Sequence, residues 1–241
     1  MTTGLVIFSR MDSQRLPGKA LKPFAGRALI GHVIDRALKA ETTDVVIVAT
    51  SDRAVDDPIA EFVEAEGVAL FRGDAEDVLK RAIDCAKAFA LKNFIRICGD
   101  SPFIDPRLLD QAVQIHRGEA PDLTTNLFPR TFPAGMSLEV IDEKALERMA
   151  SLADDPDDRE HVTTYFYRHA DDFTIRNIET EDIGYEEFPL TVDTAEDLVQ
   201  ANWIACHLAD KKGDHGVDEV LELARQWRKL NPVNKDKRKV S

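Results

Sequence analysis

Three positively charged side chains lie close together directly after the first apolar run of the sequence. Arg10, Arg15 and Lys19 follow Leu5–Phe8 within a span of ten residues. Forked guanidinium groups match pairs of phosphate oxygens, and a lysine supplies a compact point charge. The cluster therefore predicts a cradle for a triphosphate. The alternative from charge alone is a solvated basic loop before a helix.

The same loop ends in Gly18-Lys19, which is similar to the end of a phosphate-binding P-loop. That motif requires a glycine where this chain has Ser13, and a serine or threonine where it has Ala20, so a P-loop is excluded. No GxGxxG pattern follows the apolar run, which excludes the dinucleotide-binding fingerprint. Ser13 and Gly18 instead add donors to the predicted phosphate cradle.

Two aspartates follow later apolar runs and are candidate metal ligands. Asp100 comes after Phe94–Cys98 and a glycine, and Asp193 comes after Phe188–Val192. Mg²⁺ prefers oxygen ligands and takes few protein carboxylates when substrate phosphates complete its coordination. The alternatives are a turn aspartate at the first position and a helix-capping group at the second, and capping is the preferred role for Asp197.

These residues need a scaffold that brings the ends of separate strands together. Compact apolar runs alternate with amphipathic segments in the first half of the chain, which predicts a mainly parallel sheet with right-handed crossovers and helices on both faces. Ligands bind at the carboxyl ends of such strands. The predicted strands are Leu5–Phe8, Val45–Ala49, Val68–Phe71 and Phe94–Cys98. The predicted helices are Ala28–Ala40, Pro58–Glu66, Asp77–Leu91 and Pro106–Arg117, with Asp57 and Asp105 as N-caps before the two prolines.

The second half of the chain is less regular. One domain is predicted over residues 1–230, with an inserted segment at about 127–167 that serves as a lid or a dimer surface, and residues 231–241 are predicted to be a frayed tail. The predicted strands are Asp122–Thr125, Ser137–Ile141, Phe173–Ile178 and Phe188–Val192. The predicted helices are Glu143–Leu152, Pro156–His169, Ala195–Ala209 and Val217–Leu230.

The composition of the chain limits the kinds of molecule that it is expected to bind. The 241 residues carry a formal net charge of −13, so a nucleic-acid backbone or an anionic membrane would repel the chain. No apolar run approaches the roughly 20 residues of a membrane helix, and no signal peptide is recognised. The three cysteines have no metal-ligand spacing, which favours reduced, packed thiols and a cytoplasmic protein.

The first loop also resembles a known family. Arg10–Leu21 reads RMDSQRLPGKAL, which is similar to the RxxSxRLPGKxL signature of cytidylyltransferases that make CMP-activated sugars. The similarity extends from Leu5 to about Leu198 and is greatest to the spore-coat polysaccharide branch. It implies that Arg10, Arg15 and Lys19 hold the phosphates of CTP. Asp12 stands where the family usually has glycine, so its carboxylate must point to solvent or share the metal.

Two later elements resemble motifs of the same family. Gly99–Ile104 resembles GDxP(L/F)I and Val192–Leu198 resembles VDTxEDL. The resemblance implies that Asp100 and Asp193 lie beside Mg²⁺, and that Lys19, Arg15 and Asp100 are the catalytic residues. It also implies a doubly wound, three-layer α/β fold of the nucleotide-diphospho-sugar transferase type with an inserted arm.

Further segments resemble the family's base-binding and acceptor-binding elements. Thr50 ends the second apolar run, and Arg72 follows the third as the candidate reader of cytosine. For the acceptor, the candidates come from the PRTxPxGxxxEV and REHVT elements of the spore-coat branch. They are Arg130, Glu139, Arg159 and His161.

These features together predict a homodimeric enzyme that transfers CMP from CTP to a sugar or sugar acid and releases pyrophosphate. CTP and the acceptor are the expected small-molecule partners, and Mg²⁺ is the expected cofactor. Two alternatives stay open: a glycosyltransferase of the same fold, and a non-catalytic nucleotide-binding protein. The acceptor and the preference for cytosine over other bases are not determined by the sequence.

Overall fold

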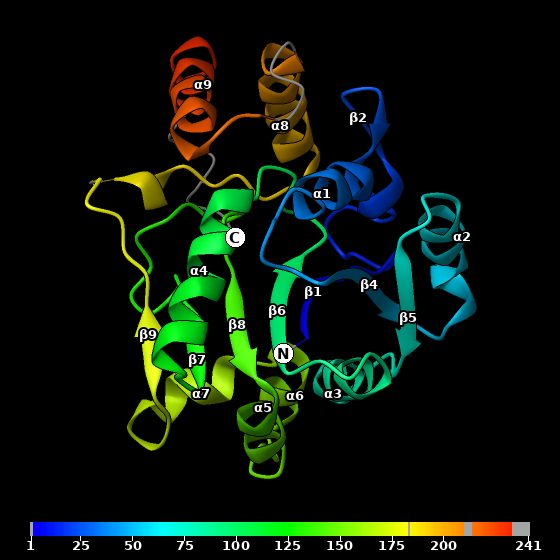
Figure 1. Ribbon diagram of the computed structural model, residues 1–241. Helices are drawn as coiled ribbons and strands as arrows, with labels where there is room; N and C mark the ends of the chain where they lie inside the picture. The colour runs from blue at the N-terminus through cyan, green and yellow to red at the C-terminus, as the bar shows by residue number, and fades with distance from the viewer. Residues whose placement is uncertain (1, 183, 210–213, 233–241) are drawn as a thin grey trace.

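A mixed β-sheet forms the centre of the computed structural model, which describes residues 2–182, 184–209 and 214–232. Within these residues the sheet has seven strands in the order β5-β4-β1-β6-β8-β7-β9 (Figure 1). Their bounds are β1 Thr3–Phe8, β4 Val45–Ser51, β5 Ala69–Gly73, β6 Asn93–Cys98, β7 Leu123–Thr125, β8 Glu139–Asp142 and β9 Ile175–Asn177. A separate hairpin pairs β2 Pro23–Phe24 with β3 Arg27–Ala28.

The strand directions confirm the predicted, mainly parallel sheet. β1 pairs in parallel with both β4 and β6, and β4 pairs in parallel with β5. β8 runs antiparallel to its neighbours β6 and β7, and β9 is again parallel to β7. The carboxyl ends of β1, β4, β5 and β6 therefore lie along one edge, where a ligand site is expected.

Both faces of the sheet are buried, because alternate residues of each strand point to opposite sides. Leu5 and Ile7 of β1 pack into one hydrophobic cluster, whereas Val6 packs into a second cluster on the other face. Strands buried on both sides read as continuous apolar runs, which is why the runs in the sequence located them well.

Helices cover each face (Figure 1). The first cluster contains residues of α1 Leu29–Ala37, α2 Asp57–Ala65, α4 Pro106–Glu119, α8 Ala195–His207 and α9 Val217–Leu230. The second contains residues of α3 Val78–Ala88, α5 Glu143–Ala150 and α7 Thr164–Arg168, and α6 Pro156–His161 lies against α3. Asp105 caps α4 as predicted, but Asp56 rather than Asp57 is the N-cap residue of α2. None of the described helices combines the length and apolar character that crossing a bilayer requires.

The predicted strand at Phe188–Val192 is wrong, since this segment pairs with loops and not with the sheet. The backbone N–H of Leu190 donates to the carbonyl of Ala134 over 2.7 Å, and that of Val192 donates to the carbonyl of Asp100 over 3.0 Å. An apolar, extended segment satisfies its packing and hydrogen bonds here without a strand partner. The second contact brings the residue after Val192 next to Asp100.

The single helix predicted at Pro156–His169 is divided into α6 and α7. The break lies at Val162, whose φ of 59° and ψ of −55° are unfavourable for a β-branched residue. Its side chain is completely buried in the second hydrophobic cluster. Burial of this apolar side chain offsets part of the backbone strain.

The region predicted to be an inserted arm at 127–167 is partly integral to the sheet. β8 lies between β6 and β7, and α5, α6 and α7 pack against the same face as α3. Of the predicted tail at 231–241, residues 233–241 lie outside the described part of the chain.

Gly135 permits the loop contact that supports this end of the sheet. Its φ is +96°, and a Cβ would lie 2.7 Å from the carbonyl carbon of Leu190. Gly67 also has a positive φ, of +68°, but a Cβ at that residue would meet no neighbouring atom within 4 Å.

We expect Gly67→Ala to lower the free energy of unfolding by about 1–2 kcal/mol from backbone strain alone, and Gly135→Ala by about 3 kcal/mol or more. Urea denaturation measures both losses, and equal losses would contradict a steric role for Gly135.

Candidate nucleotide-binding site

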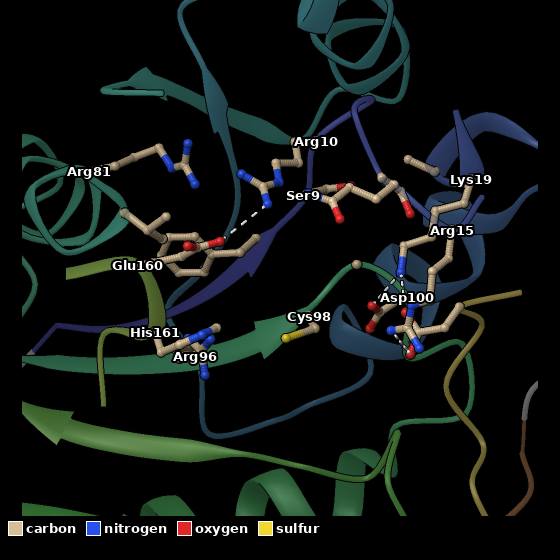
Figure 2. Close-up of a pocket in the computed structure, with 17 residues that line it drawn as sticks. Ser9, Arg10, Arg15, Lys19, Arg81, Arg96, Cys98, Asp100, Glu160 and His161 are labelled. Atoms are coloured by element: carbon tan, nitrogen blue, oxygen red, sulfur yellow. Dashed lines mark hydrogen bonds and ion pairs between the residues drawn. The ribbon is translucent and has the colours of Figure 1, made fainter. Parts of the chain in front are cut away.

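The ammonium group of Lys19 lies between two carboxylates at the carboxyl edge of the sheet (Figure 2). Its Nζ donates to Oδ2 of Asp100 over 2.7 Å and to Oδ1 of Asp193 over 2.8 Å. Arg15 adds an ion pair of 3.1 Å between its Nη2 and Oδ2 of Asp193. The loop after β1, the loop after β6 and the residue before α8 are therefore connected by ion pairs.

Local backbone structure places each of these groups. Gly18, in the left-handed conformation with a φ of 70°, precedes a short 3-10 turn at Lys19–Leu21. Its N–H donates to the carbonyl of Met11 over 2.8 Å, which folds the loop back on itself. On the other side, the capping box formed by Thr194 and Asp197 begins α8 and holds the N–H of Asp193, so the capping role predicted for Asp197 is confirmed.

Electrostatic interactions favour the charged forms of Lys19 and Asp193. Burial disfavours the ionised carboxylate of Asp193, but the hydrogen bond and charge of Lys19, together with Arg15, hold its pKa below the usual 3.8. Burial likewise disfavours the Lys19 ammonium, but Asp100 and Asp193 raise its pKa above 10.5. At neutral pH Lys19 and Asp193 are therefore both ionised.

A cavity of about 480 Å³ is lined by Lys19, Asp100 and Asp193. Most of the predicted phosphate and metal residues line it, and Gly18 shapes the loop from outside the lining. Of the sequence-based candidates, the structure brings together Arg10, Ser13, Arg15, Lys19, Asp100, His161 and Asp193. The volume and the mixed charges suit a polar, phosphorylated small molecule.

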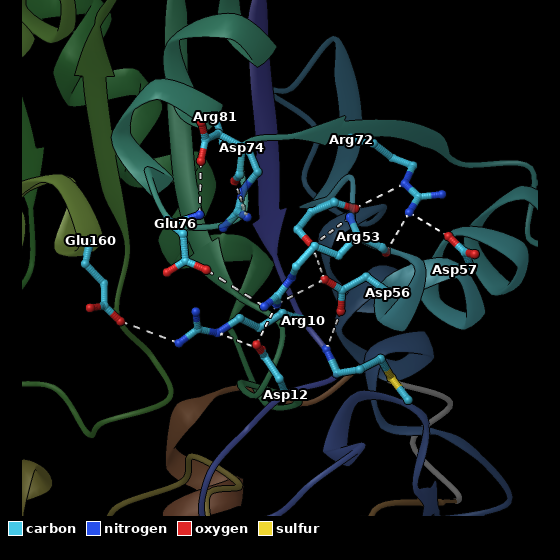
Figure 3. A network of polar contacts seen from close by, with 12 residues as sticks. Arg10, Asp12, Arg53, Asp56, Asp57, Arg72, Asp74, Glu76, Arg81 and Glu160 are labelled. Atoms are coloured by element: carbon cyan, nitrogen blue, oxygen red, sulfur yellow. Dashed lines mark hydrogen bonds and ion pairs between the residues drawn. The ribbon is translucent and has the colours of Figure 1, made fainter.

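Asp12, which replaces the usual glycine, is neutralised by two arginines (Figure 3). Its carboxylate pairs with Nη2 of Arg53 over 2.5 Å and with Nε of Arg10 over 3.2 Å. Burial opposes ionisation, but the Arg53 hydrogen bond and both positive charges hold the pKa of Asp12 below 3.8. The carboxylate is thus paired with two cations at the loop, and Asp12 is not among the residues that line the cavity.

The two candidates for base recognition are not brought into the cavity. Arg72 donates to the carbonyls of Ser51 and Arg53 over 3.1 and 2.9 Å and pairs with Asp57 over 2.7 Å. These contacts hold its guanidinium at the end of β4 and the start of α2, outside the lining of the cavity, and its role as the reader of cytosine stays a prediction. Thr50 is completely buried within the same strand.

Three of the four acceptor candidates are also placed elsewhere. Glu139 is 2% exposed and pairs with Arg96 over 2.6 Å. Arg159 donates from Nε to Asp77 over 2.8 Å, which joins α6 to the start of α3. Arg130 is exposed and donates to the hydroxyl of Ser137 over 2.9 Å. The fourth candidate, His161, lines the cavity at the end of α6.

Several lining residues were missed by sequence reasoning. They are Ser9, Gln14, Arg81, Arg96, Cys98 and Glu160. A signal for one of them existed, because an arginine inside the apolar run Phe94–Cys98 is unusual for a strand buried on both faces. Glu160 lies beside His161 and pairs with Arg10 over 3.5 Å across the cavity (Figure 2).

The carboxylates fit a metal that keeps few protein ligands. Among the described residues there is no group of three or more His, Cys, Asp or Glu side chains arranged to hold an ion. Asp100 and Asp193 supply two oxygen-bearing groups bridged by a cation. Mg²⁺ commonly takes one or two carboxylates plus substrate phosphates, so this donor set suits it when a phosphorylated ligand is present.

A parallel α/β sheet with a cationic loop and two carboxylates at its carboxyl edge defines a nucleotide-binding protein of the transferase type. Comparison with known proteins makes the class specific. The chain belongs to the cytidylyltransferase family, whose model matches residues 5–226.

Individual relatives agree with this family. The chain is 34% identical over 226 residues to the spore coat polysaccharide biosynthesis protein SpsF of Bacillus subtilis, covering 90% of this chain and 92% of that protein. A solved cytidylyltransferase from Leptospira borgpetersenii superposes with a TM-score of 0.90 at 29% identity, covering 97% of this chain and 98% of that one. A CMP:2-keto-3-deoxy-manno-octonic acid synthetase complexed with CTP shares the fold, with a TM-score of 0.67 at 21% identity over 88% of this chain and all of that one.

The pairing of Asp193 predicts an acid-dependent loss of stability. A lowered pKa contributes stability above the unfolded value of 3.8, and this contribution is lost as the pH falls through the folded pKa. We therefore expect the difference in unfolding free energy between wild type and Asp193→Asn to be largest near neutral pH and to shrink below about pH 4. Urea denaturation between pH 7 and 3 measures it, with the exposed Asp171→Asn as control. A difference independent of pH would show that the ion pair does not couple to folding.

Proposed function

We propose that the chain transfers CMP from CTP to a hydroxyl of a sugar or sugar acid and releases pyrophosphate, for the synthesis of surface polysaccharide or glycoconjugate. The observation that carries the proposal is the Lys19 bridge between Asp100 and Asp193 inside the cavity of a chain of the cytidylyltransferase family. The relatives named for spore-coat polysaccharide synthesis and for an octonic acid support the class of acceptor.

The reaction is an in-line displacement at the α-phosphorus. A bond forms from the acceptor oxygen to this phosphorus, the bond to the bridging oxygen of pyrophosphate breaks, and the hydroxyl proton is lost. Catalysis of this type depends on positioning and on neutralising charge. Arg10, Arg15 and Lys19 supply three cations for the triphosphate and the leaving pyrophosphate, and Ser13 and the Gly18 turn shape the loop around them.

The Lys19 bridge also suggests how the site changes when a nucleotide binds. The Lys19 ammonium contacts both carboxylates. A triphosphate is a stronger competitor for that ammonium, because it carries several negative charges. If Lys19 contacted the phosphates instead, Asp100 and Asp193 would be available to hold Mg²⁺, which would supply polarisation of the α-phosphate.

The alternatives are less well supported by the described residues. A metal-dependent glycosyltransferase of this fold would carry a DxD element, and here the β6 end has Asp100 followed by Ser101 and Pro102. The non-catalytic alternative depends on Asp12, whose carboxylate would repel a triphosphate, and on the altered strand end Phe8-Ser9. The Asp12 carboxylate is paired with Arg53 and Arg10, which weakens the first of these grounds. A homodimer stays a prediction that rests on the family resemblance, and a cytoplasmic location stays a prediction that rests on the spacing of the cysteines.

Nucleotide binding is the direct test of the proposal. We expect isothermal calorimetry to show CTP binding that is stronger than that of UTP, GTP or ATP and that is enhanced by Mg²⁺. The matched variant Lys19→Met should weaken CTP binding by at least about tenfold, because it removes a charge-assisted contact. Equal binding of all four nucleotides, or no binding, would contradict a cytidylyltransferase site.

The Asp100→Asn variant distinguishes an effect on catalysis from an effect on folding. Asp100→Asn keeps the shape of the side chain but removes the charge that holds the metal, so we expect kcat to fall by about 100-fold or more. The free energy of unfolding should change by only about 1–2 kcal/mol, because Lys19 keeps its contact with Asp193. Pyrophosphate release and urea denaturation provide the two measurements, with Asp171→Asn as the control. Turnover at the wild-type rate would sink the assignment of Asp100.

A further inference from the structure

Asp56 is a completely buried acidic residue that is not among the residues lining the cavity. It is the N-cap residue of α2, but its side chain makes no hydrogen bond to that helix. Instead its Oδ1 accepts the backbone N–H of Met11 over 2.6 Å, and its Oδ2 accepts the hydroxyl of Ser51. Burying a carboxyl group is costly unless it is hydrogen-bonded. Asp56 is therefore stabilised by the loop after β1 and the end of β4, and not by its own helix.

Met11 connects Asp56 to both ends of the loop that carries the cations. Its N–H is held by Asp56, and its carbonyl accepts the N–H of Gly18 over 2.8 Å. Arg10 directly precedes Met11, and Lys19 directly follows Gly18. Both of these cations line the cavity. The positions of Arg10 and Lys19 therefore depend on where Asp56 holds the backbone of Met11.

Arg53 places a positive charge beside Asp56 and links it to Asp12. Its Nη2 lies 3.7 Å from Oδ2 of Asp56 and 2.5 Å from Oδ2 of Asp12. The hydrogen bond with Asp12 raises the pKa of Arg53, which keeps the guanidinium charged. Arg72 in turn donates to the backbone carbonyl of Arg53 over 2.9 Å. The segment after β4 is thus fixed by its own contacts and can support the loop after β1.

Asp12 extends these contacts to the cavity. Its Oδ1 lies 3.2 Å from Nε of Arg10, which lines the cavity. Figure 3 shows Asp56, Arg53, Asp12 and Arg10 connected in one network. A glycine at residue 12, which the resembling family usually has, offers no side chain for Arg53 or Arg10. The ionic link between the end of β4 and the loop is therefore a feature of this chain.

We propose that Asp56 and Arg53 are positioning residues for the triphosphate, which hold the loop after β1 from the end of β4 and act on the ligand through Arg10 and Lys19. This inference rests on the proposed function, since it takes that loop to bind CTP. A loop that is ordered before the ligand arrives loses less conformational entropy on binding. Loss of Asp56 or Arg53 therefore weakens the binding of the β- and γ-phosphates more than the binding of the nucleoside.

Amide hydrogen exchange of the full chain without nucleotide tests the hold on the loop. Asp56→Ala removes the acceptor of the Met11 N–H, so we expect the Met11 and Gly18 amides to exchange about tenfold faster or more, and the amides of β6 to be unchanged. Asp56→Asn keeps an oxygen that can accept from Met11, so its exchange should be close to that of the wild type. Asp52→Ala, at an exposed aspartate of the same segment, is the control.

Calorimetry with CTP and with CMP, both in Mg²⁺, tests the effect on the phosphates, because CMP lacks the β- and γ-phosphates. We expect Asp56→Ala to weaken CTP binding by about tenfold and CMP binding by at most about twofold. Arg53→Met should act in the same direction, with a loss of at least about threefold for CTP. Arg176→Met, at an exposed arginine paired with Glu119, is the control for loss of one positive charge.

The two measurements separate this inference from the proposed function. Unchanged exchange at Met11 and Gly18 in Asp56→Ala would overturn the positioning role, and so would equal losses of CTP and CMP binding, which indicate a general effect on the domain. If Asp56→Ala does not fold, Arg53→Met decides by the same comparison of CTP with CMP. If the wild type does not bind CTP while the loop of Asp56→Ala exchanges faster, the proposed function fails and the hold of Asp56 on the loop is confirmed.

Discussion

One ammonium group holds together carboxylates that are far apart in the chain. Lys19 is separated from Asp100 by 81 residues and from Asp193 by 174 residues, yet it contacts both. Removing two carboxylates from water near one another is unfavourable unless a cation lies between them. The loop after β1, the end of β6 and the start of α8 are therefore held in one place by charge, and the cavity exists because these three segments meet there.

The same balance of charge is repeated around the cavity. Asp12 lies between Arg53 and Arg10, and Glu160 pairs with Arg10 from α6. Several cations at the cavity therefore already have carboxylate partners within the chain. A triphosphate can displace these partners because it concentrates several charges in one ligand, whereas a weakly charged molecule cannot.

The first four strands, their helices and the phosphate loop could be predicted nearly in full from the sequence. Strands buried on both faces leave long apolar runs, and the loop carries its chemistry within a dozen consecutive residues. Predictions that depended on one local pattern alone were less successful. Phe188–Val192 has the composition of a strand, but its hydrogen bonds go to the loops at Ala134 and Asp100. Val162 interrupts an otherwise helical pattern with a positive φ, and its side chain is completely buried.

The family, the loop with Arg10, Arg15 and Lys19, and the two aspartates could be identified from the sequence alone, because they are contained in short, contiguous motifs. Which other charged residues face the ligand depends on the folded chain. Arg72, Glu139 and Arg159 are paired with Asp57, Arg96 and Asp77, and these pairings could not be predicted from the sequence. A side chain's availability depends on neighbours that the fold brings from distant segments, and no local pattern records those neighbours.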